Sequence, residues 1–438
     1  MVFASKARQV MEQQDINANV RHNVVVNVAD GAFFGAATGI ASFVTVIPLF
    51  MHTLTDSATL IGLVSAIHSV GWQLPQLLTA RRVASLRRYK PMVLLMTINE
   101  RLPFFGLALI AWFAADLGRE LALWLAYMLL IWQGLGGGLT ATAWQTMIGK
   151  IMPHRWRGTF FGVQSAAANL LASIGAVAAG VILDKLPSPI DFVVCFGVSG
   201  VAMFISWSFL AWTKEPSREP EHTHGSQRDF WASIANILKR DRNFRWFLAS
   251  RIISQLGLMA TAFFTVYAVQ RFGLDDQTAG IMTALYLIIQ TVANPIMGWL
   301  GDRIGYRRVM EVGALLALGA GLGAWLAPAL GWFYLIFAIA GVANVAFWTM
   351  AMAMTLEFGS LAERPSYIGL ANTLTAPATL VAPLIGGWLA DSAGYNYTFA
   401  VAAAGGLLTW LILRFAVRDP QSVTYSEAHA EPQVVVVS

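Results

Sequence analysis

Long apolar runs separated by short polar segments dominate this chain of 438 residues. A helix needs about 20 mostly apolar residues to cross the hydrocarbon core of a bilayer, and twelve such runs occur. In the first half they cover residues 23–50, 59–79, 91–115, 121–148, 158–182 and 190–212, and in the second half residues 244–270, 277–300, 309–328, 331–357, 367–390 and 395–416. The runs are continuously apolar and do not alternate with a period of two, which favours helices over a β-barrel. The pattern predicts an all-α integral membrane protein with twelve transmembrane helices.

Composition supports this prediction and excludes other classes. Hydrophobic residues make up 57% of the chain and charged residues 12%, whereas a soluble domain carries about a quarter charged residues. The net charge is +5, and the basic residues form short clusters between apolar runs rather than one stripe, so we expect no nucleic-acid partner. Cys195 is the one cysteine, which excludes an intramolecular disulfide and a cysteine-based metal cluster.

The distribution of basic residues predicts the topology. Twelve spans place both termini and all even-numbered connections on one side. Of the 29 lysines and arginines, only Arg119, Lys185 and Arg271 lie in odd-numbered connections, while Arg101 and Arg251 lie inside spans. By the positive-inside rule, both termini are cytoplasmic. We therefore expect a multi-pass protein of the cytoplasmic (inner) membrane.

The longest polar connection, residues 213–243, separates the sixth span from the seventh. Residues 213–225 are rich in charge and proline and predict a flexible linker, in which we interpret His222 and His224 as solvated residues rather than metal ligands. Apolar residues at helical spacing follow among basic ones, which predicts a short amphipathic helix on the membrane surface: Phe230, Trp231, Ile234 and Leu238. The predicted organisation is a tail (1–22), a six-helix bundle (23–212), the linker (213–243), a second bundle (244–417) and a tail (418–438).

The two bundles repeat in sequence. Spans five and six match spans eleven and twelve without a gap at an offset of 207 residues, pairing Arg157 with Arg364, Gly162 with Gly369, Gly180 with Gly387, Asp184 with Asp391 and Phe192 with Phe399. At an offset of 220, Pro75 pairs with Pro295 and Arg87-Arg88 with Arg307-Arg308. Two parallel six-helix repeats are typical of transporters with a site at the bilayer midplane.

The loop after the eighth span resembles the signature loop of the major facilitator superfamily. It reads Gly298-Trp-Leu-Gly301-Asp302-Arg303-Ile-Gly305-Tyr-Arg307-Arg308. The resemblance implies a fold of two pseudo-symmetric six-helix bundles and a cytoplasmic gating loop, in which Asp and Arg latch the bundles: Gly301, Asp302, Arg303, Gly305, Arg307 and Arg308. Asp302 can accept bonds from helix N-terminal amides, and Gly305 permits a tight turn. The first-half loop has Arg82 for the Asp and Ser85 for the Gly, so we expect the second-half loop to carry the latch. The subfamily stays open.

Ionisable residues inside spans are costly and are therefore candidates for ion coupling. Asp30 lies in the first span and Arg251 at similar depth in the seventh. The resemblance implies that both spans line the central cavity, so the two side chains would face each other. Asp30 is then either a proton or cation site, with a pKa set by burial and by the arginine, or half of an ion pair that steadies one conformation.

A second group of ionisable residues lies in spans two and three. Glu100 and Arg101 lie near the depth of His68. Two interpretations remain: a proton relay between Glu100 and His68, and an inert, satisfied network within the first half.

Aromatic side chains with a few amides mark the presumed cavity wall: Phe34, Trp144, Tyr267, Trp348, Gln133, Gln255 and Asn344. Such a wall suits a largely apolar solute better than a sugar, whose hydroxyls need polar partners. No P-loop, G-x-S-x-G or H-E-x-x-H motif occurs, so we expect neither an enzyme nor a cofactor or metal.

The sequence thus predicts a secondary active transporter in the lipid bilayer. We expect it to move a small lipophilic solute by alternating access, as a monomer and as a proton-coupled antiporter that exports, although another cation gradient could also drive it. The alternative is a transporter-like protein that does not transport and serves as an assembly, pigment-binding or lipid-binding subunit with a protein partner.

Overall fold

The computed structural model describes the backbone of residues 2–219 and 226–420, and the side chains from residue 14 onward except 58, 276 and 277. The first half consists of α1 (Val2–Ile40), α2 (Val46–Leu54), α3 (Ala58–Gln73), α4 (Gln76–Ala84), α5 (Lys90–Met96), α6 (Ile98–Trp112), α7 (Ala114–Leu117), α8 (Arg119–Ile151), η1 (His154–Trp156), α9 (Arg157–Lys185) and α10 (Ile190–Ala211). The second half consists of α11 (Gln227–Arg240), α12 (Arg242–Met259), η2 (Ala260–Ala262), α13 (Phe264–Phe272), α14 (Asp276–Ile304), α15 (Tyr306–Leu326), α16 (Trp332–Val345), the π-helical η3 (Ala346–Met350), α17 (Ala351–Thr355), α18 (Arg364–Ser392) and α19 (Tyr395–Phe415).

The twelve predicted spans are present, with one interruption that changes how they are counted. Within the described residues, 11 helical stretches are long and apolar enough to cross a membrane. The predicted span 59–79 is instead divided into α3 and α4 at Leu74-Pro75. Proline has no N–H to donate and its ring disturbs the preceding turn, so the helix breaks there. Taken together, α3 and α4 form the twelfth span, and the predicted all-α membrane fold is confirmed.

The predicted N-terminal tail is a continuation of the first span. α1 runs without interruption from Val2 to Ile40, a length of roughly 58 Å at 1.5 Å per residue. It therefore extends well beyond the roughly 30 Å of a hydrocarbon core. Most of the predicted C-terminal tail, residues 421–438, lies outside the described residues.

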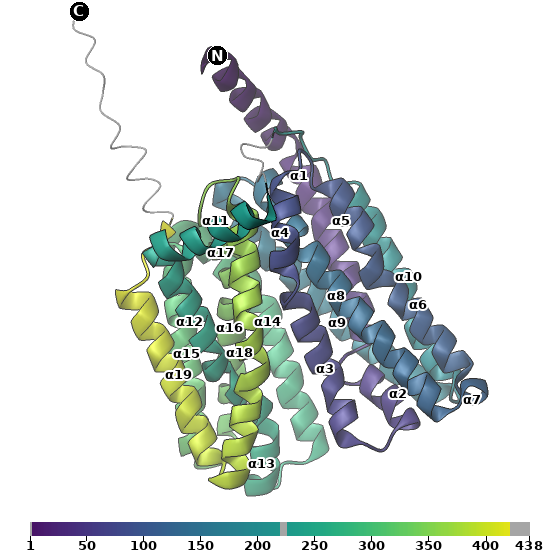
Figure 1. Ribbon diagram of the computed structural model, residues 1–438. Coiled ribbons are helices and arrows are strands. Elements are labelled where there is room, and N and C mark those ends of the chain that lie inside the picture. Colours follow the sequence, from purple (N-terminus) through teal and green to yellow (C-terminus); the bar gives the residue numbers. More distant parts are fainter. Residues whose placement is uncertain (1, 220–225, 421–438) are drawn as a thin grey trace, which may run out of the picture.

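The helices form two groups that lie side by side (Figure 1). In the first group α1 packs against α9 and α10, and α8 packs against α3 and α6; in the second, α19 packs against α12 and α15, and α16 packs against α14 and α15. Both described chain ends lie at the same end of the molecule (Figure 1). We call this end the terminal face and the opposite end the distal face.

The two groups are joined at the terminal face. One hydrophobic core there contains residues of both groups, including Leu77 and Phe161 from the first and Tyr306 and Phe358 from the second. Nearer the distal face each group has a core of its own, without members from the other group among the described residues. The molecule is thus closed at the terminal face and parted toward the distal face.

Glycines allow the backbones of α9 and α14 to touch at this closed end. A Cβ at Gly298 would lie 2.2 Å from the carbonyl oxygen of Gly158, and a Cβ at Gly162 would lie 2.3 Å from that of Asn294. Small residues at such positions let membrane helices approach closely. Gly162 belongs to the sequence repeat, and its repeat mate Gly369 makes a similar close approach to α4. A Cβ at Gly369 would lie 2.8 Å from Cα of Leu77.

The start of the predicted flexible linker is held against the first group. Glu215, with 1% of its side chain exposed, pairs with Lys150 Nζ at 2.9 Å and accepts from the backbone N–H groups of Tyr89 and Lys90 at 2.9 and 2.8 Å. Asn23 exchanges two 2.9 Å hydrogen bonds with the backbone of Lys214. No sequence pattern indicated this contact, because a glutamate between Lys and Pro is typical of a solvated loop.

The predicted amphipathic helix exists as α11 and lies across the terminal face (Figure 1). A capping box of Ser226 and Asp229 begins it. Its apolar side packs Phe230, Ile234 and Ile237 into the terminal core, while Trp231 remains 42% exposed. The helix therefore packs its apolar side mainly against the protein, and Trp231 remains free to contact an adjoining bilayer surface.

Candidate functional site

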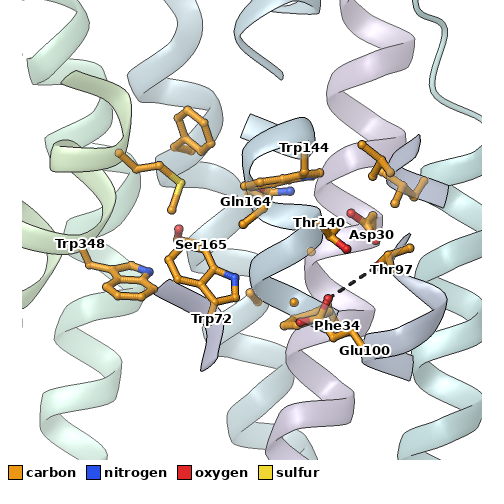
Figure 2. Close-up of a pocket in the computed structure, with 18 of the residues that line it drawn as sticks. Asp30, Phe34, Trp72, Thr97, Glu100, Thr140, Trp144, Gln164, Ser165 and Trp348 are labelled. Atoms are coloured by element: carbon orange, nitrogen blue, oxygen red, sulfur yellow. Dashed lines mark hydrogen bonds between the residues drawn. The ribbon is translucent and has the colours of Figure 1, made fainter. Parts of the chain in front are cut away.

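A cavity of about 290 Å³ lies between the two groups of helices. Aromatic rings from both groups line it, and Trp72 and Trp348 pack against each other in its wall, with centroids 5.3 Å apart (Figure 2). Two of the predicted cavity residues of the first group, Phe34 and Trp144, also form part of its wall. The wall is mainly apolar, with a polar cluster on the side of α1 and α6.

The polar cluster consists of Asp30, Glu100 and Arg101, all nearly buried. Arg101 lies between the carboxylates, with Nη2 3.6 Å from Asp30 Oδ1 and Nη1 4.0 Å from Glu100 Oε2. Ser206 Oγ donates to Asp30 Oδ1 at 2.6 Å and accepts from Arg101 Nη2 at 3.0 Å. Asp30 is therefore well compensated, whereas among the described residues Glu100 has only the distant guanidinium and a 3.5 Å bond from Thr97 (Figure 2).

The structure does not bring Asp30 and Arg251 together. The partner of Asp30 is Arg101, from its own group. Arg251 instead donates from Nη1 to Asn372 Oδ1 at 3.0 Å, and Asn372 Nδ2 donates to Gln76 Oε1 at 2.7 Å across the interface. The depth of a residue in its span can be predicted from sequence, but the direction of its side chain depends on the rotation of the helix, which the sequence left open.

His68 lies in the cavity wall without touching Glu100. Its Nδ1 lies 3.0 Å from Gln133 Oε1, and its ring stacks on Phe43 with centroids 3.9 Å apart. Gln133 lies behind His68 and not in the cavity wall. A proton relay between Glu100 and His68 would thus need an intermediary, and the histidine is held in a network of its own.

The other predicted cavity residues belong to a second cavity or to neither. A second cavity of about 250 Å³ is lined by Arg251, Gln255 and Asn344, and Trp348 borders both cavities. Trp348 lies in η3, and π-helical segments are frequent at functional sites because they redirect side chains. Tyr267 lies in the distal core among rings such as Phe333 and Phe399 and lines neither cavity.

The predicted gating loop joins the two groups through Asp302. Its carboxylate accepts from Gly158 N, Thr159 N and Thr159 Oγ1, each at 2.7 Å, and from Tyr306 OH at 2.6 Å. Gly158 and Thr159 form the first turn of α9, where free amides and the helix dipole favour a negative charge. The sequence-based expectation of helix amides as partners agrees with this geometry, which is a link from the second group to the first.

The remaining loop residues shape the turn or make contacts within their own group. Gly305 has φ +93°, a conformation that favours glycine, and a Cβ at Gly301 would lie 2.5 Å from the Tyr306 ring. Arg303 stacks on Trp299 at 4.1 Å, and Arg307 donates to Val417 O at 2.9 Å and pairs with Glu311. Arg308 is exposed. In the first-half loop, Arg82 is also exposed.

A second link across the terminal face was not foreseen from the sequence. Glu357 pairs with Arg157 at 2.9 Å and also contacts His154. Burial raises the pKa of Glu357, but the bonds and charges of His154 and Arg157 outweigh burial and hold the pKa below its ordinary value of 4.5. Arg157 and its repeat mate Arg364 both donate to the carbonyl oxygen of Gly149, at 2.7 and 3.3 Å. The repeated arginines thus meet at one acceptor.

Comparison with known proteins establishes the family. The sequence model of the Major Facilitator Superfamily matches residues 30–275 and 247–437. The chain belongs to the major facilitator superfamily. Membership indicates a secondary transporter of small solutes rather than an enzyme. Among the described residues, no group of three or more His, Cys, Asp or Glu side chains is arranged to hold a metal ion, and His222 and His224 lie outside those residues.

Relatives with assigned names match only parts of this superfamily chain. It is 24% identical over 132 residues to the multidrug transporter protein MdtP of Bacillus subtilis, 30% of this chain and 24% of that one. It is 28% identical over 166 residues to the vesicular acetylcholine transporter of Drosophila melanogaster (37% and 28%), and 26% identical over 160 residues to the class B tetracycline resistance protein of Escherichia coli (35% and 39%). The matched segments span less than half of each relative's length.

Solved superfamily structures share the fold at low identity. The E. coli fucose:proton symporter FucP superposes with a TM-score of 0.71 at 16% identity, covering 90% of this chain and 98% of that one. The human organic anion transporter MFSD10 gives 0.71 at 14%, covering 90% and 99%. A bacterial homologue of ferroportin in an outward-facing state gives 0.65 at 14%, covering 92% and 99%.

Proposed function

We propose that the protein is a proton-driven antiporter that exports a lipophilic, cationic solute by alternating access. The observation that carries the proposal is the buried cluster of Asp30, Glu100 and Arg101 in the wall of an aromatic cavity. Figure 2 shows the two carboxylates of this cluster among the aromatic residues. Two carboxylates beside one guanidinium leave one excess negative charge when both are ionised. A bound proton or a cationic solute compensates that charge, and a medium of low dielectric constant makes compensation favourable.

Glu100 is the better candidate for the proton that moves. Asp30 keeps a short bond from Ser206 and the nearer approach of Arg101. Glu100 lacks comparable contacts, and Gly137 provides the space beside it, since a Cβ there would lie 2.7 Å from Glu100 Oε1. A weakly compensated carboxylate on a cavity wall responds most strongly to a change in hydration when the cavity changes sides.

The solute class is inferred from the wall of the cavity. Trp72, Trp144 and Trp348 offer large apolar surfaces and faces that attract cations. Hydroxyl and amide groups also line the cavity, for example those of Thr140, Gln164 and Ser165, but most of the wall's surface is apolar. The relatives described as a multidrug transporter and a tetracycline resistance protein support export of such compounds.

Sidedness is proposed from charge. The terminal face carries a depression lined by the basic residues Lys150, His154, Arg155, Arg157 and Arg218. Positively charged connections remain in the cytoplasm, so the terminal face is cytoplasmic and the structure is outward-facing. A cavity between two groups of helices and a latch between them favour transport over the alternative of a non-transporting subunit.

Flux in proteoliposomes tests the proposal. With an imposed pH gradient and tetraphenylphosphonium as the lipophilic cation, Asp30→Asn and Glu100→Gln should abolish gradient-driven flux, because the amides cannot exchange a proton. Counterflow exchange of the cation should survive in at least the Glu100→Gln protein, since exchange needs no net proton movement, but it should need a higher cation concentration because the excess negative charge of the cluster is gone. Asp184→Asn, at an exposed position on α9, is the matched control. Gradient-driven flux that persists in both cluster variants would refute the proton site.

A further inference from the structure

The second cavity contains a buried positive charge that the protein does not balance. Arg251 is 8% exposed and lines this cavity of about 250 Å³ together with Gln255, Asn344 and Trp348. Its side chain donates to Asn372 Oδ1, a neutral acceptor. Within the described part of the chain, no ion pair joins Arg251 to a carboxylate. An arginine stays protonated at any physiological pH.

Of the three other arginines that are buried in the described part of the chain, two have a carboxylate partner, while Arg364 donates to the carbonyl oxygen of Gly149 at 3.3 Å. Arg101 lies between Asp30 and Glu100, and Arg157 pairs with Glu357. Arg251 lies about 13 Å along α12 at 1.5 Å per residue, in a stretch that can span a membrane. A charge at such depth is costly unless it is paired or hydrated.

The neighbours of Arg251 in the cavity wall are uncharged, and half of them are polar. Thr379 Oγ1 lies 3.3 Å from Gln73 Oε1 and 3.4 Å from Gln255 Oε1, and Gln255 Nε2 lies 3.4 Å from Arg251 O. These bonds are long, so the amides can turn toward a small ligand at little cost. Gln73 belongs to the first group of helices, so the cavity is complete only when the two groups are together at this level.

We propose that this cavity is an anion subsite in which Arg251 binds one monovalent anionic group. That group is a carboxylate, either of the solute or of a small free acid, or a chloride ion. The amides of Gln73, Gln255 and Asn344 supply neutral donors around it, as anions require in a site that excludes most water. Because Trp348 borders both cavities, a solute with an apolar body and a carboxylate could reach from one cavity to the other.

Thermal unfolding of the purified protein tests this inference without transport. Chloride and acetate are titrated separately at constant ionic strength, against gluconate as the reference anion, which carries the same charge on a larger body. A ligand that binds only the folded protein raises the unfolding midpoint in a saturable way. A rise with chloride identifies a halide site, and a rise with acetate identifies a carboxylate site. Either result supports the inference, and its absence with both anions overturns it.

Variants locate the effect. Arg251→Gln should lose the anion dependence, whereas Arg271→Gln, which removes an exposed arginine outside both cavities, should keep it. Asn372→Asp places a carboxylate against the guanidinium, with Gln76 turning its amide to match. In gluconate, this variant should have the same unfolding midpoint as the wild type saturated with chloride or acetate, and neither anion should change it further. It provides the test if Arg251→Gln does not fold. A response unchanged in both Arg251→Gln and Asn372→Asp would overturn the inference.

The inference is independent of proton coupling. Glu100→Gln leaves the second cavity intact, so its anion response should equal that of the wild type even if proton-driven flux is never observed. If the anionic group belongs to the solute, the inference also rests on the proposed transport function. Comparing the flux of one solute as its carboxylate and as its methyl ester then separates a failure of the anion subsite from a failure of transport.

Discussion

Replacing Asp302 by Asn tests the latch between the two groups most directly. The carboxylate accepts four bonds of 2.6 to 2.7 Å, and three of their donors, Gly158 N, Thr159 N and Thr159 Oγ1, belong to the other group. Asparagine keeps one acceptor oxygen and presents an N–H₂ group where the second oxygen was. The two donors of Thr159 then lose their acceptor and meet a competing donor.

The magnitude follows from the bonds lost. Hydrogen bonds to a charged group contribute about 1.5 to 3 kcal/mol each, and a negative charge at a helix N-terminus adds about 0.3 to 1 kcal/mol. Losing two bonds and the charge should weaken the closed terminal face by about 3 to 7 kcal/mol. Because about 1.4 kcal/mol is tenfold in an equilibrium constant, the population should shift roughly 100- to 100,000-fold toward the state open at the terminal face.

This shift is measured as the distance between two spin labels, one at Arg155 and one at Arg308. Both are exposed positions at the terminal face, and they belong to opposite groups. The labels are introduced as cysteines after Cys195, which is buried, is replaced by serine. Asp302→Asn should add a longer distance and slow transport while leaving membrane insertion and helix content nearly unchanged, because the contacts within each group are kept. Arg303→Gln removes an exposed charge from the same loop without touching the other group and is the control. A distance distribution identical to that of the control would refute the latch.

Three further predictions concern other contacts at the terminal face. Glu357→Gln removes the partner of Arg157 and His154 and should open the terminal face in the same distance measurement. In the wild type, the pKa of Glu357 is held below its ordinary value. The contact of Glu357 with Arg157 should therefore persist at neutral and mildly acidic pH and weaken only as the pH falls through that lowered pKa. Gly298→Val should prevent closure of the terminal face, because its Cβ would lie 2.2 Å from Gly158 O, and the long label distance should predominate. Gly180→Val is the control: no atom lies within 4 Å of a Cβ there, so the distance distribution should not change. Glu215→Gln breaks a buried pair with Lys150 inside one group and should lower the free energy of unfolding by about 3 kcal/mol without changing the label distance; an altered distance would contradict this assignment.

Hydropathy and repeats predicted the spans because transfer into a bilayer is a property of each segment alone. The role of Asp302 was also predictable, since a carboxylate in a glycine-containing loop suits helix amides, although the sequence did not say that these belong to α9. The partners of Asp30 and Arg251 were not predictable, because they depend on how neighbouring helices are rotated about their axes. Glu215 was missed because its burial depends on the positions of Lys150 and the start of α5.

The two cavities differ in the sign of their charge, and this difference bears on how the halves communicate. In the first group, Asp30 and Glu100 outnumber Arg101 at the wall of one cavity, whereas Arg251 stands without a counter-charge among the described residues in the wall of the other. Trp348 borders both, and it lies in a π-helical segment whose register differs from that of the helices around it. In the proposed alternating access, each charge exchanges protein neighbours for water or solute when the groups rock, and the two changes are of opposite sign. A solute that carries both an ammonium group and a carboxylate would compensate both at once, so its binding would favour the state in which the two cavities adjoin. A purely cationic solute would compensate only the negative charge of the Asp30–Glu100–Arg101 cluster. Anions from the medium would then have to compensate the positive charge of Arg251.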